Sequence, residues 1–263
     1  MYPALTLSGH GPVPAYELML ALGACVLVAV VAGSAARMEL PRAPVFAWLS
    51  GTYLAAVLGA RAAFAAARLP ATGEALAALS DPRAIGFSSL GAVAAGGLAA
   101  WWLARRLDVP FERLATPLLL GGCLFGAIAR VGCFLAGCCH GLPTALPWGV
   151  LYPAAAPAVR LYGPGAAVHP WPLYDAALLL AIAARLAWPG ARQGPKPASA
   201  AGAYLLGRFA LEFLRGDVTR HAGLSTPQWL ALGLMAFGAA VLAVRGIEER
   251  QRNPSRLGDV WLK

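Results

Sequence analysis

The sequence predicts an all-α, polytopic membrane protein with about seven transmembrane helices in a single domain over residues 1–263. Of the 263 residues, 59% are hydrophobic and 13% are charged, and the mean hydropathy is +0.63; ordinary soluble domains are less apolar. At about 1.5 Å per residue, seven apolar runs are long enough, or nearly so, to cross a hydrocarbon core of roughly 30 Å. These runs cover residues 15–35, 45–66, 86–104, 117–136, 172–188, 201–215 and 228–245.

The runs differ in how clearly they predict a spanning helix. No basic residue precedes the first run and Arg37 follows it, so we expect a retained helix rather than a cleaved signal peptide. Alanine and glycine fill the runs and allow helices to approach closely. The fifth and sixth runs are the least apolar, because they carry Asp175, Arg208 and Glu212.

The positions of the basic residues predict the orientation. When the seven runs alternate across the membrane, 13 of the 21 Lys and Arg residues fall on one side, which the positive-inside rule assigns to the cytoplasm. The N-terminus is then outside and the C-terminus inside. Although the net charge is +9, the basic residues form no stripe and no aromatic binding motif accompanies them. Nucleic acid is therefore not an expected partner. The cytoplasmic set is Arg37, Arg42, Arg105, Arg106, Arg113, Arg185, Arg192, Lys196, Arg245, Arg250, Arg252, Arg256 and Lys263.

Two long irregular stretches, 69–85 and 140–171, are expected on the outer face. The second is rich in proline and glycine, so it should not form regular helix. Its aromatic residues Trp148, Tyr152, Tyr162 and Trp171 suit the membrane interface. We therefore expect this region to lie as a lid or shelf over the outer leaflet.

Four ionisable residues in or beside the apolar runs are candidates for function, because charge inside a membrane is costly and usually faces a cavity or a partner. Arg208 and Glu212 are four residues apart, so they can pair on one helix face. Arg130 ends the fourth run, and Arg61 lies in the second. Snorkelling arginines and a neutralised packing pair are the structural alternatives. Arg130 and Arg208 converging in a cavity would suit the phosphate of a phospholipid.

The stretch "RVGCFLAGCCHG" at 130–141 adds three cysteines and a histidine. The spacing of Cys133, Cys138, Cys139 and His140 is unlike that of known zinc sites. A disulfide from Cys133 to Cys138 or Cys139 is possible, and so are free thiols that act as small packing residues. The imidazole of His140 can transfer protons near neutral pH, although a loop histidine is more often simply solvated.

The motifs "RVGCFLAGCCHG", "PWGVLYP", "HPWPLYDA", "GAYLLGRFALEFLRGD" and "LSTPQWLAL" occur in the order seen in the prolipoprotein diacylglyceryl transferase family, which this sequence resembles. "GPVPAYELMLALG" resembles the family's entry to the first helix. The signature positions are matched by Arg130, Gly132, Phe134, Gly137 and Gly141. The resemblance covers most of the chain and implies seven helices in the bacterial cytoplasmic (inner) membrane, with the active site facing the outer leaflet.

The resemblance implies transfer of the diacylglyceryl group of phosphatidylglycerol to the lipobox cysteine of a prolipoprotein, among membrane lipids and without a cofactor or metal. Arg130 and Arg208 match the family's phosphate-binding arginines. Tyr16, Tyr204 and Glu212 match residues that line its cavity. Gly141 and Cys133 fall at signature positions in the expected substrate site. His140 is our candidate for proton transfer, so the expected catalytic set is Arg130, Arg208 and His140.

The sequence departs from the family pattern at four positions. Cys133 replaces an asparagine, Cys138 an acidic residue and His140 a tryptophan, and Leu90 stands where the family commonly has the histidine proposed as the base. These differences keep two alternatives open. One is a related membrane transferase with a different acceptor, and the other is a non-enzymatic thiol or redox membrane protein.

Overall fold

The structure is a computed structural model, and it describes residues 4–6, 12–72, 89–188 and 197–236, together with residues 238 and 240. Most of the predicted outer stretch 69–85, the first residues of the third predicted span and the end of the seventh therefore lie outside the described residues. So do several of the basic residues that predict the orientation: Arg192, Lys196, Arg245, Arg250, Arg252, Arg256 and Lys263.

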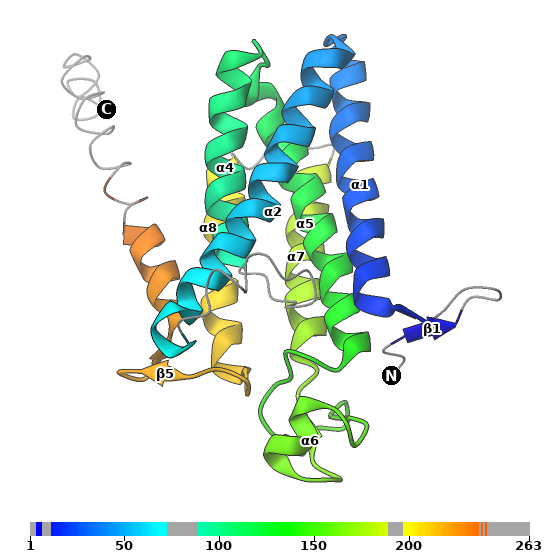
Figure 1. Ribbon diagram of the computed structural model, residues 1–263, viewed down its shortest axis with the longest axis vertical. Coiled ribbons are helices and arrows are strands. Elements are labelled where there is room, and N and C mark those ends of the chain that lie inside the picture. Colours follow the sequence, from blue (N-terminus) through cyan, green and yellow to red (C-terminus); the bar gives the residue numbers. More distant parts are fainter. Residues whose placement is uncertain are drawn as a thin grey trace, which may run out of the picture. The chain divides into compact units, whose positions relative to one another are not determined.

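The fold is predominantly helical, and a helix is present in each of the seven predicted segments (Figure 1). The helices are α1 (Ala15–Arg37), α2 (Arg42–Thr72), α4 (Ser89–Arg106), α5 (Phe111–Ala136), α6 (Pro157–Tyr162), α7 (Trp171–Ala187) and α8 (Pro197–Leu211), and residues 226–236 are also helical. Among the described helices, three are long and apolar enough to cross a membrane: α1, residues 42–65 of α2, and α5. The full set of seven spans and the orientation of the termini stay predictions.

Three short antiparallel ribbons, which the all-α expectation did not include, join the helices. They pair β1 (Ala4–Thr6) with β2 (Pro12–Pro14), β3 (Val150–Leu151) with β4 (Ala167–Val168), and β5 (Arg220–His221) with β6 (Leu224–Ser225). The region 140–171 was expected to lack regular helix, and this was wrong for the six residues of α6. Pro157 stands at the first position of this helix, where its missing N–H costs nothing.

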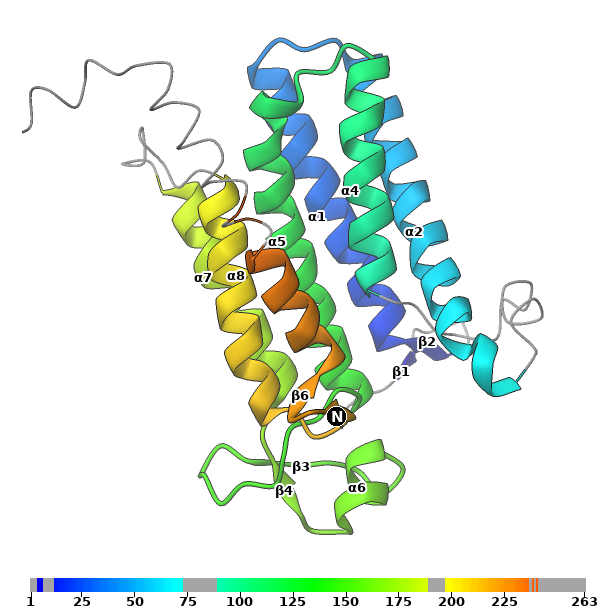
Figure 2. The ribbon, with the colours of Figure 1, turned by 90° about the vertical axis from the view of Figure 1, so that its left-hand side faces the viewer.

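The chain divides into two compact units. The first, which we call the apolar unit, is Gly23–Phe125 and contains most of α1, all of α2 and α4, and the first part of α5. Helices α2 and α4 lie side by side (Figure 2) because Gly59 and Gly91 face each other; a Cβ on Gly91 would lie 2.1 Å from the Gly59 carbonyl oxygen. The buried core of the apolar unit consists of Val31, Ala35, Val45, Trp48, Leu49, Ala100, Ala104, Val109 and Leu114.

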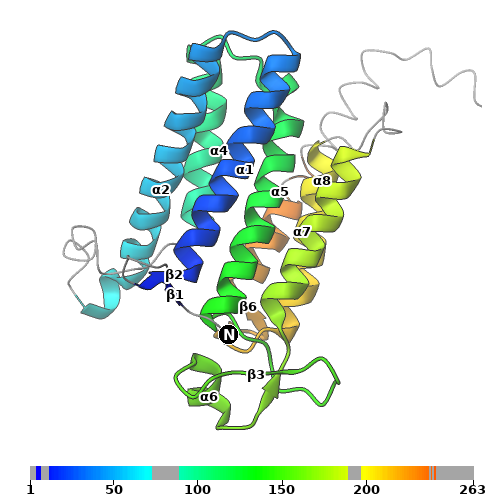
Figure 3. The same cartoon turned by 90° about the vertical axis from the view of Figure 1, so that its right-hand side faces the viewer.

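The second, the polar unit, is Met1–Leu22 with Gly126–Lys263. Helices α7 and α8 run side by side in it (Figure 3), and Gly207 of α8 packs against Leu178 of α7. The start of α1 meets the end of α5 at Gly132, where a Cβ would lie 2.9 Å from the Cβ of Met19. The expected catalytic and substrate-binding residues all lie in this unit, so the site is described within it alone; the remaining candidate, Arg61, lies on α2 in the apolar unit.

The helix of the sixth predicted span lies four residues earlier than expected, because α8 is Pro197–Leu211 and not 201–215. A 3-10 turn, Glu212–Leu214, follows it. The end of the helix is fixed by side chains that take its free carbonyl groups. Trp171 Nε1 donates to Leu211 O at 2.7 Å, and the Arg220 guanidinium donates to three carbonyl oxygens in residues 212–215.

Candidate functional site

The C-terminus of α5 turns sharply at Gly137, which has a left-handed φ of 75°. The amide of Gly137 donates to Phe134 O and the amide of Cys138 to Cys133 O, both at 3.2 Å. These are the two hydrogen bonds of a Schellman motif, which favours glycine at this position. The turn folds the following loop back over the last turn of the helix and places Cys138 beside Cys133.

The loop after this turn is held against the end of α8 by backbone hydrogen bonds. The amide of Leu142 donates to Leu214 O at 2.9 Å, and the amide of Gly216 donates to His140 O at 3.0 Å. Gly141 is required by close approach, since a Cβ there would lie 2.5 Å from the Cβ of His169 and 2.9 Å from Leu214 O. Motifs about 75 residues apart in sequence therefore meet at a fixed position.

Three arginines converge on the indole ring of Trp171 at the start of α7. The guanidinium carbons of Arg208, Arg215 and Arg130 lie 4.5, 4.8 and 5.2 Å from the ring centroid. The ring is fully buried, so these cation–π contacts are formed away from bulk water, where they are worth about 2 kcal/mol or more. The Trp171 ring thus contacts positively charged side chains from α5, from α8 and from the turn after α8.

Buried carboxylates hold the arginines in place. Asp175 accepts from Arg130 Nε at 2.6 Å and lies 3.9 Å from Arg208 Nε, while Glu212 pairs with Arg208. Both carboxylate side chains are fully buried. A second oxygen of Glu212 accepts from Ser225 Oγ at 3.0 Å. Asp175 Oδ1 has no hydrogen-bond partner in the described part of the chain, so it remains able to accept one.

Arg215 is one of the three arginines around Trp171, and it also contacts a cysteine thiol. It forms two hydrogen bonds to Asp217, at 2.6 and 3.1 Å, and its Nη2 lies 3.8 Å from Cys139 Sγ. Burial lowers the pKa of Arg215, but the hydrogen bonds and charge of Asp217, together with Cys139 and Glu212, raise it above its usual value. The guanidinium therefore stays charged at any physiological pH.

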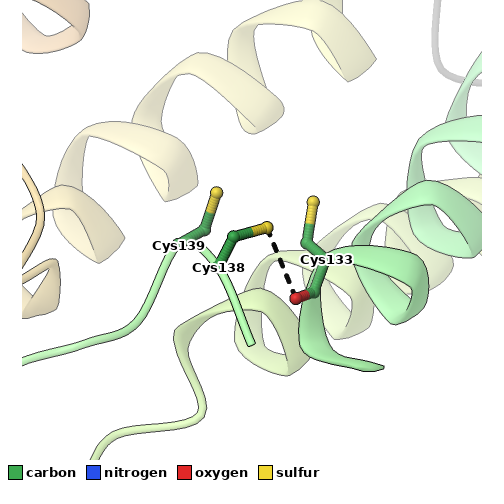
Figure 4. A group of neighbouring side chains, drawn as sticks. All are labelled: Cys133, Cys138 and Cys139. Atoms are coloured by element: carbon green, nitrogen blue, oxygen red, sulfur yellow. Dashed lines mark hydrogen bonds between the residues drawn. The ribbon is translucent and has the colours of Figure 1, made fainter. Parts of the chain in front are cut away.

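The sulfur atoms of Cys133, Cys138 and Cys139 all lie within 4.8 Å of one another (Figure 4), and all five cysteines of the chain are free thiols. Cys138 Sγ also contacts Cys133 O at 3.4 Å. Hydrogen bonds from the Cys133 and Cys138 thiols lower the pKa of Cys139, and the charges of Arg215 and Arg130 lower it further. Hydrogen bonds with Cys133 and Cys139 raise the pKa of Cys138. The group therefore concentrates thiolate character on Cys139.

Residues 3–244 match the family described as prolipoprotein diacylglyceryl transferase. The chain belongs to this family. The resemblance inferred from the motifs is therefore confirmed over most of the sequence.

Curated relatives in the prolipoprotein diacylglyceryl transferase family carry the name phosphatidylglycerol–prolipoprotein diacylglyceryl transferase. A Clostridium tetani protein is 29% identical over 60% of this chain and 64% of its own length. A Clostridium perfringens protein, numbered 2, is 30% identical over 63% and 65%. A Streptomyces coelicolor protein, also numbered 2, is 33% identical over 60% and 51%. The match thus spans about half to two thirds of these relatives' length.

Most residues expected from the family lie around the arginine group. Arg130 and Arg208 meet through Asp175, and the predicted pair of Arg208 with Glu212 is present. Tyr204, on α8, is within electrostatic reach of both arginines. Tyr16, at the start of α1, is within electrostatic reach of Arg130 and the three thiols. Leu90, at the family's histidine position, lies on α4.

The alternative in which His140 is simply solvated is wrong, because its side chain is only 2% exposed, and its role in proton transfer stays a prediction. Its Nδ1 lies 3.1 Å from Gly141 O, and its ring packs edge-to-face on Tyr162 at 5.5 Å. A carbonyl oxygen only accepts hydrogen bonds, so the proton is assigned to Nδ1 and the lone pair of the neutral ring to Nε2.

Three residues of this site were missed as site residues. Asp175 was noted only as a charge that weakens the fifth span, Arg215 only as the end of the sixth, and Trp171 only as an interface aromatic. The spacing within each motif carries no information about partners 40 or more residues away. The available signal was Asp175 itself, because a carboxylate in an apolar run implies a nearby cation.

Proposed function

We propose that this protein transfers the diacylglyceryl group of phosphatidylglycerol to the lipobox cysteine thiol of prolipoproteins. The observation that carries the proposal is the convergence of Arg130, Arg208 and Arg215 on Trp171 in a member of this family. The names of the curated relatives support the same donor and acceptor. We place the reaction at the outer leaflet of the bacterial inner membrane, where exported precursors and phospholipid meet.

In this reaction the acceptor thiolate attacks the carbon of the diacylglyceryl group that is bonded to the phosphate oxygen. A carbon–sulfur bond forms, the carbon–oxygen bond to phosphate breaks, and glycerol phosphate leaves with the negative charge. Guanidinium groups bind such an oxyanion bidentately and remain protonated throughout. A low-polarity site in which the cations are already oriented stabilises the charge as it develops, without reorganisation.

The buried carboxylates give the arginines their orientation. Without phosphate, three guanidinium groups in close contact would repel one another, and Asp175 and Glu212 neutralise part of that charge. The side chains of Arg130, Arg208 and Arg215 keep 21%, 13% and 17% exposure. Each therefore remains accessible to a ligand on one side while its other side is held by a carboxylate.

The acceptor thiol must lose its proton, and His140 is the proposed base. In the assigned tautomer Nε2 offers a lone pair, whereas Leu90 has no group that can accept a proton. Tyr16, Tyr204, Glu212, Gly141 and Cys133 complete the proposed substrate site around Arg130 and Arg208. The lipobox segment and surrounding membrane lipids are the proposed partners of this site.

The direct test is the lipidation of a lipobox peptide by the purified protein in phosphatidylglycerol vesicles, followed by mass spectrometry. Wild type should add one diacylglyceryl unit to the peptide. Arg130→Ala should lower the rate by roughly 100- to 1,000-fold, the usual cost of removing one group that stabilises a developing oxyanion. The matched control is Arg185→Ala, which removes an exposed arginine of α7 and should leave the rate unchanged. A wild-type protein that leaves the peptide unmodified beside an active homologue would overturn the proposal.

A related transferase with a different acceptor is the second candidate, and the substitutions Cys133, Cys138, His140 and Leu90 are what favour it. Complementation of a bacterial strain that lacks its own transferase separates the two functions. Rescue requires prolipoprotein as the acceptor. If lipid is consumed in vitro, but neither the peptide is modified nor the strain is rescued, the acceptor is another thiol or small molecule.

A further inference from the structure

The proposed transfer assigns no bond-making or proton-transfer step to the three clustered cysteines, although Cys133 borders its substrate site, and their geometry indicates a further role. Cys133 extends from the last turn of α5, while Cys138 and Cys139 extend from the loop that folds back over it (Figure 4). The sulfur atoms of Cys133 and Cys139 point the same way, and that of Cys138 lies between them in this view. Each of the three sulfur atoms is within 4.8 Å of the other two.

The backbone is shaped to bring these thiols together. The Schellman motif at Gly137 places Cys138 over Cys133, and Cys139 has a positive φ of 55°. A left-handed backbone is uncommon for a residue other than glycine and persists only where its surroundings hold it. Here backbone hydrogen bonds fix the loop: His140 O accepts from the amide of Gly216, and the amides of Gly141 and Leu142 donate to His169 O and Leu214 O.

The spacing of the sulfur atoms fits a three-coordinate metal. With metal–sulfur bonds of about 2.3 Å, three sulfur atoms around one ion in a plane lie about 4.0 Å apart. Sulfur atoms within 4.8 Å of one another reach this arrangement by small side-chain rotations. The group contains no fourth histidine, cysteine or carboxylate ligand among the described residues. Structural Zn(II) is almost always four-coordinate, so three thiolates alone suit a soft monovalent ion better.

The surroundings of the thiols favour the negative charge of such a complex. Three thiolates and one monovalent cation carry a net charge of −2. Arg215 Nη2 lies 3.8 Å from Cys139 Sγ, and Arg130 is within electrostatic reach of Cys133 and Cys139. Each guanidinium is also paired with a carboxylate, Arg130 with Asp175 and Arg215 with Asp217, so the two groups stabilise the complex by lying close to its sulfur atoms and do not cancel its full charge.

A second, independent feature points to a ligand at this place. The hydroxyl of Tyr152 is buried and has no hydrogen-bond partner in the described part of the chain, although the residue is only 8% exposed. Its ring packs beside Gly137, and its side chain is within electrostatic reach of all three thiols. An unpartnered buried hydroxyl costs about 1–3 kcal/mol, so this part of the site keeps a polar group that is free to bind a ligand.

We propose that Cys133, Cys138 and Cys139 form a three-thiolate binding site for a soft d10 cation of the Cu(I) class. Each thiol releases its proton to solvent as its sulfur binds the ion, and no oxidant or reductant is consumed when the ion enters as Cu(I). The site lies beside Arg215 and shares Cys133 with the proposed substrate site, but binding of the ion does not require transferase activity.

The test uses the full-length protein, purified in detergent under reducing conditions and freed of metal. Cu(I) is added from a complex with a coloured chelator of known affinity, so that its transfer to the protein is followed by absorbance. Bound copper is then counted by mass spectrometry, and free thiols are counted by alkylation. We expect one copper per chain and loss of alkylation at Cys133, Cys138 and Cys139, whereas the exposed Cys25 should react equally with and without copper.

The variants separate the cluster from the other cysteines. Cys138→Ser should weaken Cu(I) binding by roughly 100-fold, because it removes one of three ligands. Cys25→Ser and Cys123→Ser remove cysteines outside the cluster and should leave affinity unchanged. Circular dichroism checks that each variant is folded, and the alkylation result on wild type needs no variant at all.

Several results would overturn the site. These are copper uptake that survives replacement of all three clustered cysteines, protection of Cys25 or Cys123 instead, and uptake of Zn(II) or Cd(II) without any uptake of Cu(I). A disulfide within the cluster that persists under reduction and prevents copper binding would overturn it as well. Uptake of Cu(I) that protects the three clustered thiols, in a protein with or without lipidation activity, supports it.

Discussion

The apolar unit and the polar unit each bury one tryptophan completely, and the two indoles have different surroundings. In both, the indole N–H donates to a backbone carbonyl at 2.7 Å: Trp48 to Ala100 O, and Trp171 to Leu211 O. The ring of Trp48 packs in an aliphatic core and meets Phe111 edge-on at 6.5 Å. The ring of Trp171 instead faces three guanidinium groups.

This difference shows how the two units are stabilised. The apolar unit depends on shape, because small residues such as Gly59 and Gly91 allow backbones to touch and apolar side chains fill the remaining space. The polar unit depends on the pairing of buried charges, because removal of one partner leaves the other uncompensated. Substitutions that respect volume should therefore be tolerated in the first unit, whereas in the second the charge must be preserved.

The largest effect on stability is expected from Asp175→Ala. This change removes the carboxylate that Arg130 contacts at 2.6 Å, and leaves a guanidinium in a buried site without its partner. Breaking a buried ion pair from one side costs about 3–5 kcal/mol. Thermal unfolding in detergent, followed by circular dichroism, should show a clear fall in the midpoint, and lipidation activity should be lost with it.

Glu112→Ala is the control, since Glu112 is an exposed carboxylate of the apolar unit in the first turn of α5. Its loss should cost well under 1 kcal/mol, as is usual for a charge near a helix N-terminus. Equal midpoints for the two variants would show that the ion pair does not hold the polar unit together.

Gly91→Ala in the apolar unit should lower stability by less than Asp175→Ala does, and it should act through packing and not through charge. The new methyl group would lie 2.1 Å from Gly59 O, so α2 and α4 must separate. Overpacking of this kind costs about 1–3 kcal/mol, and the activity of the molecules that remain folded should be retained. The same thermal measurement and the lipidation assay check both statements.

Gly97→Ala, on the same helix, is the matched control because a Cβ there meets nothing within 4 Å. Alanine in place of a helical glycine stabilises by about 0.5–1 kcal/mol where there is room for it. The two glycine variants should therefore shift the unfolding midpoint in opposite directions. Shifts of the same sign would mean that the close contact of Gly59 with Gly91 is not what limits the packing of the pair.

The helices could be predicted from the sequence because each depends on a local run of apolar residues. The pairing of Arg208 with Glu212 was also predictable from their four-residue spacing, which brings them together although Glu212 begins the 3-10 turn after α8. The end of α8 was not, because it is set by Trp171 and Arg220 from other segments. The local sequence pattern thus predicts the secondary structure of a segment. It does not predict which distant segment determines where that structure ends.

The site was predicted only in part for the same reason. Arg130 and Arg208 stood out as charges in apolar runs, yet their shared partner Asp175 lies 45 residues from Arg130. The burial of His140 depends on Tyr162 and on the backbone near Gly216, so its solvated interpretation failed. The approach of the three thiols was encoded locally by Gly137, whose position after the last helical turn favours the reversal.

The smallest change, and the closest comparison of the two units, is tryptophan to phenylalanine at both positions. Trp48→Phe and Trp171→Phe each remove one hydrogen bond of the same length and part of a buried ring, so each should cost about 1–2 kcal/mol of stability. Only Trp171→Phe should also change the rate of lipidation. A phenyl ring attracts cations less strongly than indole, and the orientation of three guanidinium groups depends on that ring, so lipidation should fall by roughly tenfold. Equal midpoints with unequal rates would show that Trp171 acts on the charges around it. Equal rates would show that it only packs, as Trp48 does.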